Sequence, residues 1–314
     1  MPTPISVRKV ERFGLQRKIV ANMTTESWQN IPHAAFVYEP DVTEFWNEWC
    51  KIKNLPEFAG ISINTVLMYA CTKGFVAAPE MNAHIHYNHK FVSGKITQYD
   101  EINVSMPAAM SDGKMMTLNV RGCESKTLRE LADYIADLYR RMEPTVLDEA
   151  MFEVSLENTM RLLKKFKFFT ILGRFMGLIP SRKEIRKLKG REKKQYRAMS
   201  ANERLTKKDI EQGTVLISNI GSVYRGSYCT PTLIDVIPPM VAAVALGSFI
   251  EKPGLITGPD GATTIAPRKF LPINLNFDHR GLDFDGVAPF MKCLDQIFAN
   301  PTQIINWLKS TPKA

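Results

Sequence analysis

The chain has little of what marks a disulfide-rich, disordered or repetitive protein. Its 314 residues include only five cysteines, which are scattered and form no CxxC pair. Such a set argues against a disulfide framework or a zinc ribbon and fits a reducing compartment, so we expect a cytoplasmic protein. Hydrophobic residues make up 45% and charged residues 23% of the chain, which is ordinary for a globular fold.

Long apolar runs are also scarce. Residues 1–11 contain no apolar stretch of the kind that a secretory signal needs. The longest apolar run, near residues 168–180, contains Arg174 and is shorter than the about 20 apolar residues of a membrane span. We therefore expect neither a signal peptide nor a membrane-spanning helix.

Acidic residues are depleted in one stretch only. The net charge of +9 comes from 41 Lys and Arg against 32 Asp and Glu. Residues 161–208 hold 17 of these basic residues and three glutamates, a local charge of +14 that leaves −5 for the remainder. The net charge therefore bears on what residues 161–208 bind, and it gives no information about the main fold.

Helical and strand-like patterns are mixed along the chain. Apolar periodicity predicts helices over 13–31, 42–53, 63–76, 127–142 and 287–298. Strands are predicted over 34–38, 85–91, 102–109, 115–120, 214–218, 240–249 and 270–277. Thr127 and Glu130 have the spacing of a capping box. This mixture predicts an α/β or α+β class with a mixed sheet.

Two stretches contain the residue types of a catalytic site. One is a buried-type strand that ends in Ser218 and Asn219, and the other places His279 at a strand end, four residues before Asp283. A histidine can accept a proton from a thiol or hydroxyl near neutral pH. A serine hydroxyl can attack as a nucleophile or donate to an oxyanion. From these residues alone, a structural role for His279 stays the commoner outcome.

Both stretches resemble motifs of the dihydrolipoamide acyltransferases of 2-oxoacid dehydrogenase complexes, in the chloramphenicol acetyltransferase-like superfamily. The family's T-I-S-N-L-G strand corresponds to residues 215–221, and its D-H-R-x-x-D-G loop to residues 278–284. The register without gaps also aligns Phe290 and Asn300-Pro301, whereas a match to Asp285-Gly286 needs a two-residue insertion. The register without gaps puts Phe284 where the family has glycine. A bulky residue there is expected to narrow the pocket or reshape the loop, because glycine alone adopts positive φ freely.

Further matches follow in the family's order and cover roughly residues 10–140 and 210–308. They lie at residues 17–33 (R-x-x-I-A…S…I-P-H), 79–83 (P-x-x-N-A), 112–118 (D-G-L-V-V-P-V), 127–132 (S-L-x-E-L-A), 228–231 (F-T-P) and 238–239 (P-P-Q). The resemblance implies a chloramphenicol acetyltransferase-like fold in which helices flank a mixed sheet. It implies a single catalytic domain over 1–314, with an inserted basic helical segment at 146–208.

The resemblance also implies an activity, acyl transfer between coenzyme A and a thiol that is dihydrolipoyl or otherwise carrier-borne. His279 would be the general base, Ser218 the oxyanion donor and Asp283 the residue that holds the loop, with Asn219 and Thr230 binding substrate. Coenzyme A or acyl-CoA would be the substrate, and no bound metal is implied. Family members are trimers in which histidine and serine come from neighbouring chains, so we expect a homotrimer or a larger assembly of trimers.

The partners of the basic segment stay open. No lipoyl or subunit-binding domain is expected before the catalytic region, so the chain would carry no covalent lipoyl group and its acceptor would arrive in trans. The segment is interpreted as a solvated helical hairpin or as a docking site for an acidic carrier protein. A membrane surface is a further alternative. Nucleic acid fits least, because no known binding motif accompanies the charge.

Other functions are weighed against acyl transfer to a thiol. A condensation-type enzyme of the same superfamily would acylate an amine or alcohol, and a degenerate member would be a scaffold. A Ser–His–Asp hydrolase is disfavoured, because the G-x-S-x-G elbow is absent. His84, His86 and His89 suggest a metal site, but on a strand His89 would face away from the other two, so no metal is predicted.

Overall fold

The computed structural model describes residues 5–111, 113–151, 188–222 and 228–313. The chain forms two compact units. The smaller unit consists of residues 1–25 and 141–208, and the larger unit of residues 26–140 and 209–314.

A six-stranded mixed sheet is the centre of the larger unit. Its strand order is β1-β10-β7-β6-β4-β5, with β4–β6 and β6–β7 parallel and the other pairs antiparallel. The strands are β1 (His33–Tyr38), β4 (Val104–Ala109), β5 (Met115–Val120), β6 (Val215–Asn219), β7 (Ala242–Leu246) and β10 (Ile273–Asp278). Every residue of β7 and β10 is buried, so these two strands lie in the core.

The helices of the larger unit supply most of the remaining core. They are α2 (Thr43–Ile52), α3 (Ile63–Ala77), α4 (Leu128–Met142), α8 (Lys207–Ile210) and α9 (Phe284–Ala299), of which α4 and α8 extend into the smaller unit. Short 3₁₀ helices are η1 (Pro56–Phe58), η2 (Pro79–Met81), η3 (Cys123–Ser125), η5 (Ile220–Ser222) and η6 (Pro301–Leu308). The predicted capping box of α4 is confirmed, because the Thr127 backbone N–H donates to the Glu130 carboxylate at 2.8 Å. Helices α3 and α9 pack closely, since a Cβ on Gly74 would lie 2.6 Å from the Phe290 ring.

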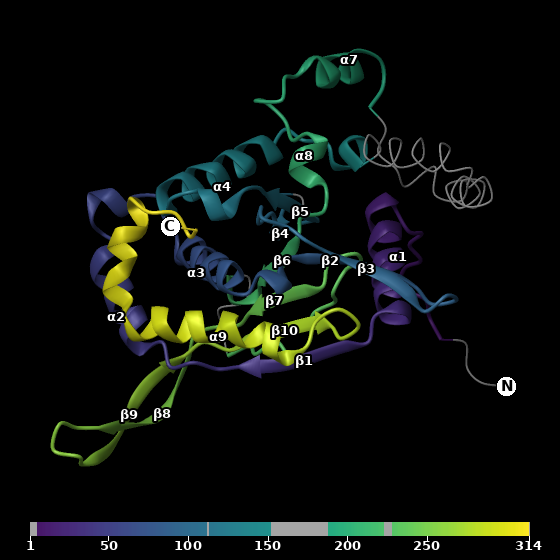
Figure 1. Cartoon of the computed structure of the whole chain (residues 1–314). Helices are drawn as coiled ribbons and strands as arrows, with labels where there is room; N and C mark the ends of the chain where they lie inside the picture. Colours follow the sequence, from purple (N-terminus) through teal and green to yellow (C-terminus); the bar gives the residue numbers. More distant parts are fainter. Residues whose placement is uncertain (1–4, 112, 152–187, 223–227, 314) are drawn as a thin grey trace. The chain divides into compact units, whose positions relative to one another are not determined.

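Two separate hairpins complete the larger unit. Strand β2 (Ala83–Asn88) pairs with β3 (Ser93–Gln98), and β8 (Ile250–Thr257) pairs with β9 (Thr263–Phe270). Figure 1 shows β8 and β9 reaching away from the central sheet. The sequence patterns predicted one strand at 85–91 and none at 250–257. Most residues of these hairpins are exposed, so they lack the apolar alternation that marks a half-buried strand.

The expected α/β class with a mixed sheet and flanking helices is confirmed. The elements predicted from strong periodicity all occur, with ends shifted by a few residues. The largest shift at a helix start concerns α9, which begins at Phe284 instead of 287. The helix therefore starts directly after the predicted catalytic loop.

The described secondary structure of the smaller unit is helical, and the sequence of this unit is strongly basic. It contains most of α1 (Leu15–Asn30), the helical residues 147–151, and α7 (Gly190–Ala198). Its sequence holds 23 Lys and Arg against nine Asp and Glu. The Arg204 guanidinium lies 4.7 Å from the centre of the Tyr196 ring, and the Leu205 backbone N–H donates to the Thr145 hydroxyl at 2.9 Å.

The predicted basic insertion at 146–208 is described only in part. Residues 152–187, which include the apolar run at 168–180, lie outside the described residues. The boundaries of the insertion and the single-domain organisation therefore stay predictions. In the part of the chain that the structure describes, none of the helices has the length and apolarity needed to cross a bilayer.

Candidate active site

The two predicted catalytic stretches lie at opposite ends of the central sheet. Ser218 on β6 is in register with Ala245 on β7, which is in register with Asn274 on β10. His279 comes five residues after Asn274, and five residues of a strand span about 17 Å. Ser218 and His279 of one chain are therefore not brought together.

A buried ion pair fixes the loop after β10. The Asp278 side chain is fully buried, and its carboxylate accepts hydrogen bonds from the Arg280 backbone N–H at 3.0 Å and from the Arg280 guanidinium at 2.6 Å. The hydrogen bond to Asp278 raises the pKa of Arg280. The same guanidinium lies 5.5 Å from the centre of the Tyr87 ring. Because a buried carboxylate needs such partners, the backbone on both sides of His279 is held in one arrangement.

His279 and Asp283 are brought together at the end of this loop. The imidazole Nδ1 lies 3.2 Å from the Leu282 carbonyl oxygen and 3.2 Å from Asp283 Oδ1. A carbonyl oxygen and a carboxylate only accept hydrogen bonds, so we assign the proton of the neutral ring to Nδ1. Nε2 then keeps a lone pair. The side chains of His279 and Asp283 are 56% and 78% exposed, so an incoming molecule can reach them.

Phe284 does not strain the backbone of the loop. It is the first residue of α9, and Val92 is the one described non-glycine residue with a positive φ. The backbone at Phe284 therefore does not need the positive φ that glycine adopts freely, while the expected narrowing of the pocket stays a prediction. The Phe284 side chain is 56% exposed and packs against Phe36, with 5.3 Å between ring centres. A large aromatic surface thus lies directly beside the His279–Asp283 pair.

The serine end of the sheet is held by close backbone packing. A Cβ on Gly221 would come within 2.3 Å of the Gly247 carbonyl oxygen, so two main chains are in contact three residues after Ser218. This contact explains the motif glycine. Asn219 donates its side-chain N–H to Asn64 Oδ1 at 3.0 Å, a partner in the first turn of α3 that sequence reasoning missed.

Thr230 lies at the serine end as well. The preceding residue, Cys229, accepts a hydrogen bond from the Ser248 backbone N–H at 3.0 Å, next to the end of β7. Thr230 itself is exposed. The structure therefore places Ser218, Asn219 and Thr230 at one end of the sheet and His279 with Asp283 at the other.

The histidines of β2 have separate surroundings. The two ring nitrogens of His84 lie within hydrogen-bond distance of the Gly213 carbonyl oxygen (3.3 Å) and the Tyr99 hydroxyl (3.1 Å), and burial lowers the pKa of this histidine. His86 is exposed, and His89 follows the end of the strand. Over the described ranges, no group of three or more His, Cys, Asp and Glu side chains could hold a metal ion.

The sequence contains a local signal for the ion pair that fixes the loop around His279. Aspartate and arginine two residues apart at a strand end can form a closed ion pair, as Asp278 and Arg280 do. The contact of Arg280 with Tyr87 has no such local signal, because the two residues are far apart in the chain.

A protein-family model, described as 2-oxoacid dehydrogenases acyltransferase (catalytic domain), matches residues 6–154 and 181–306. A curated relative is the dihydrolipoyllysine-residue acetyltransferase component of the pyruvate dehydrogenase complex of Corynebacterium glutamicum. It is 22% identical over 292 residues, which cover 91% of this chain and 32% of the relative. The chain spans half or less of the length of the curated relatives it matches.

Solved structures with the same fold come from similar proteins. A probable dihydrolipoamide acetyltransferase from Listeria monocytogenes superposes with a TM-score of 0.62 at 20% identity, covering 94% of this chain and 95% of that chain. The dihydrolipoamide acetyltransferase of Azotobacter vinelandii superposes with a TM-score of 0.59 at 19% identity, covering 97% and 100%. The latter was studied for the role of a serine, a histidine and an asparagine in its catalytic mechanism.

Proposed function

The chain belongs to the family of 2-oxoacid dehydrogenase acyltransferases, by a match to the catalytic domain, and on this basis we propose that it transfers an acyl group between coenzyme A and a thiol. The acceptor is a dihydrolipoyl group or another carrier-borne thiol. The observation that carries the proposal is the His279–Asp283 pair, which leaves Nε2 free on an anchored, exposed loop. In the Azotobacter enzyme the histidine and the asparagine are also four residues apart.

In the proposed reaction, His279 Nε2 accepts the proton of the incoming thiol. The thiolate sulfur attacks the thioester carbonyl carbon and forms a new carbon–sulfur bond, which gives a tetrahedral intermediate with a negative oxygen. The intermediate collapses with cleavage of the original carbon–sulfur bond. The leaving thiolate takes the proton back from His279, so the histidine ends the cycle neutral. Asp283 holds the ring and stabilises the transient imidazolium.

Ser218 donates its hydroxyl hydrogen to the negative oxygen of the intermediate. Because Ser218 and His279 of one chain are separated by about 17 Å along the sheet, the donor must come from a second copy. We therefore propose a homotrimer, or a larger assembly of trimers, in which the histidine end of one copy meets the serine end of the next. Asn219 and Thr230 then contact the substrate from the serine end.

The direct test is an assay with acetyl-CoA and dihydrolipoamide that follows thioester exchange. We expect turnover by the wild-type protein and its loss in His279→Ala. Retained turnover in a folded His279→Ala variant contradicts the role of His279. Absence of turnover with every thiol acceptor, from a folded and assembled wild-type protein, contradicts acyl transfer to thiols and supports a scaffold or an enzyme that acylates amines or alcohols.

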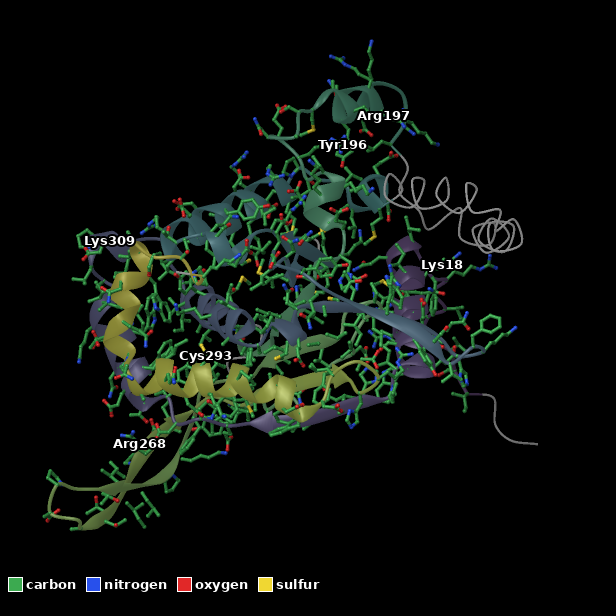
Figure 2. The ribbon with its side chains drawn as sticks, in the orientation of Figure 1. Lys18, Tyr196, Arg197, Arg268, Cys293 and Lys309 are labelled. Carbon is green, nitrogen blue, oxygen red and sulfur yellow. The ribbon has the colours of Figure 1, made fainter. Side chains whose placement is uncertain are left out.

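The carrier is proposed to dock on the basic segment. In α7, Arg191, Lys194 and Arg197 are exposed and are spaced three residues apart, so they lie along one side of the helix, whereas Tyr196 is buried. Nitrogen-tipped side chains stand out from this helix in Figure 2, where Arg197 is labelled. This exposed face has cations and no large apolar side chain, which suits an acidic protein surface better than a bilayer.

Charge reversal tests this docking surface. We expect Lys194→Glu to raise the KM for a dihydrolipoyl group on an acidic carrier domain and to leave the KM for free dihydrolipoamide unchanged. The effect should shrink at high salt. Lys53→Glu, on an exposed residue of the larger unit, is the matched control. Equal KM values for the carrier in all three proteins contradict the proposed surface.

A further inference from the structure

Two cysteines of the larger unit lie on neighbouring helices. Cys71 is in α3 and Cys293 is in α9, and Figure 1 shows these two helices next to each other. Both thiols are free, and Cys71 is buried whereas Cys293 is partly exposed. Figure 2 labels Cys293 on α9. The proposed acyl transfer uses neither thiol, so the pair can serve a chemistry of its own.

Two contacts fix the direction and register of α3 against α9. A Cβ on Gly74 would lie 2.6 Å from the Phe290 ring. Glu80, which follows α3 in η2, lies against Gly286, because a Cβ on that glycine would come within 2.5 Å of Glu80 Oε2. Residue numbers therefore rise along one helix as they fall along the other, and the two helices run antiparallel.

The same register puts Cys71 opposite Cys293. Cys71 comes one turn before Gly74, and Cys293 comes one turn after Phe290. Residues three apart lie on the same side of a helix, so each cysteine lies on the side where its helix meets the other. A disulfide joins Cα atoms that are about 4–7 Å apart. The missing side chain at Gly74 lets the two backbones approach to the short end of the about 8–10 Å between packed helices, which brings such a bond within reach.

The electrostatics of the two thiols agree with this register. Burial, and then the charge of Cys293, raise the pKa of the Cys71 thiol to about 12, so each sulfur acts on the other across the helix pair. Burial also raises the pKa of Cys293, and Lys73 of α3 partly offsets this rise. Because the thiolate is the reacting form, both thiols exchange slowly at neutral pH. Cys293 is the one that solvent reaches, so an oxidant meets it first.

We propose that Cys71 and Cys293 form a reversible disulfide in the folded chain, with a small disulfide such as oxidised glutathione as the oxidant. The Cys293 thiolate attacks one sulfur of the oxidant, which gives a mixed disulfide and releases one glutathione thiolate. The Cys71 thiolate then attacks the Cys293 sulfur, and the second glutathione thiolate leaves. The protons of the two cysteines end on the two released thiols. The cysteines lose two electrons and the oxidant gains them.

The disulfide would tie α9 to α3 in the native fold. Helix α9 starts directly after Asp283, so the cross-link would hold the helix that follows the loop of His279. A bond between residues far apart in the chain also restricts the unfolded state. We therefore expect the thermal midpoint to be about 5 °C higher in the oxidised protein than in the reduced protein.

The test incubates the full-length native protein with excess oxidised glutathione at pH 8.5. Free thiols are then blocked, the protein is digested without reduction, and mass spectrometry searches for a peptide pair that joins Cys71 to Cys293. We expect this pair in wild type and its loss in Cys293→Ser. Cys50→Ser is the matched control, because Cys50 is also partly exposed and lies on another helix, α2. In Cys71→Ala, glutathione should stay bound to Cys293.

Each outcome decides the inference. A linked pair that dithiothreitol separates, in a protein whose thermal midpoint is at or above that of the reduced form, supports it. Absence of the pair in wild type overturns it, as does a pair that forms only in urea or that lowers the midpoint. Links from Cys71 to Cys50 at equal yield would also overturn it. These readouts need no turnover, so they stand apart from the success or failure of the proposed acyl transfer.

Discussion

The two ends of the central sheet are built by different means. The histidine end relies on charge, since the buried Asp278 holds Arg280 and thereby the loop around His279. The serine end relies on contact between main chains, at Gly221 and Gly247, three residues after Ser218. A general base needs a ring that is held from one side and open on the other. An oxyanion donor needs a fixed backbone, which close packing provides.

In the proposed mechanism each chain therefore carries two incomplete sites. The histidine end would supply the base, His279, with Asp283 beside it, and the serine end would supply the hydroxyl donor, Ser218, with Asn219 and Thr230. Four experiments test how the two ends differ.

The largest effect is expected at the histidine end. His279→Ala removes the proposed general base for the thiol proton, so kcat for thioester exchange should fall about 1000-fold. The thermal midpoint should change little, because the ring is more than half exposed. A kcat within tenfold of wild type contradicts the role of His279 as general base.

Mixed assemblies test whether the two ends come from different copies. Ser218→Ala should lower kcat about 100-fold or more by removing the oxyanion donor. In a mixed trimer of Ser218→Ala and His279→Ala chains, about one interface in three has both residues intact. Co-expressed and co-purified chains should therefore be far more active than either parent. Activity no higher than that of the parents would argue for a site within one chain.

Glycine-to-alanine substitutions, which each add a methyl group, test how tightly the two ends of the sheet are packed. At Gly221 a Cβ meets the fixed Gly247 carbonyl at 2.3 Å, whereas at Gly281 it meets a movable isoleucine methyl group at 3.1 Å. Gly221→Ala should cost about 1–3 kcal/mol of unfolding free energy, in line with overpacking. Gly281→Ala should cost less. Urea denaturation measures both, and equal losses would contradict the contrast.

The smallest effect is expected at Asp283. Its carboxylate is 78% exposed, and an ion pair this open contributes about 0.2–1 kcal/mol. Asp283→Asn should therefore lower kcat about two- to fivefold and keep the KM for both thiols. A loss of 100-fold would show instead that Asp283 takes part in proton transfer.

The sequence patterns predict the helices and strands that bury apolar side chains, on one face or on both. The apolar stripe of 127–142 and its capping box predict α4, because a half-buried helix repeats its apolar residues on one side. The β8–β9 hairpin was missed because most of its residues are exposed, so no alternation marks it. A periodic pattern of apolar residues arises because some side chains are buried. A strand whose side chains are mostly exposed has no such pattern and is not predicted.

The candidate site was predictable only within each local stretch. The spacing of His279 and Asp283 placed them near each other, since four residues bridge the end of a loop and the start of a helix. The separation of Ser218 from His279 depends on the register of β6, β7 and β10, which residues far apart in the chain determine. The resemblance to a family supplied what the local pattern could not, by implying that neighbouring copies share the site.

The distance between Ser218 and His279 has a consequence for how the protein behaves in solution. If each complete site needs two copies, the rate per chain depends on how many chains are associated, and dilution below the dissociation constant of the assembly would lower it. The rate would then rise more steeply than in proportion to protein concentration. The protein concentration would thus control the activity per chain, although the fold of each chain stays the same.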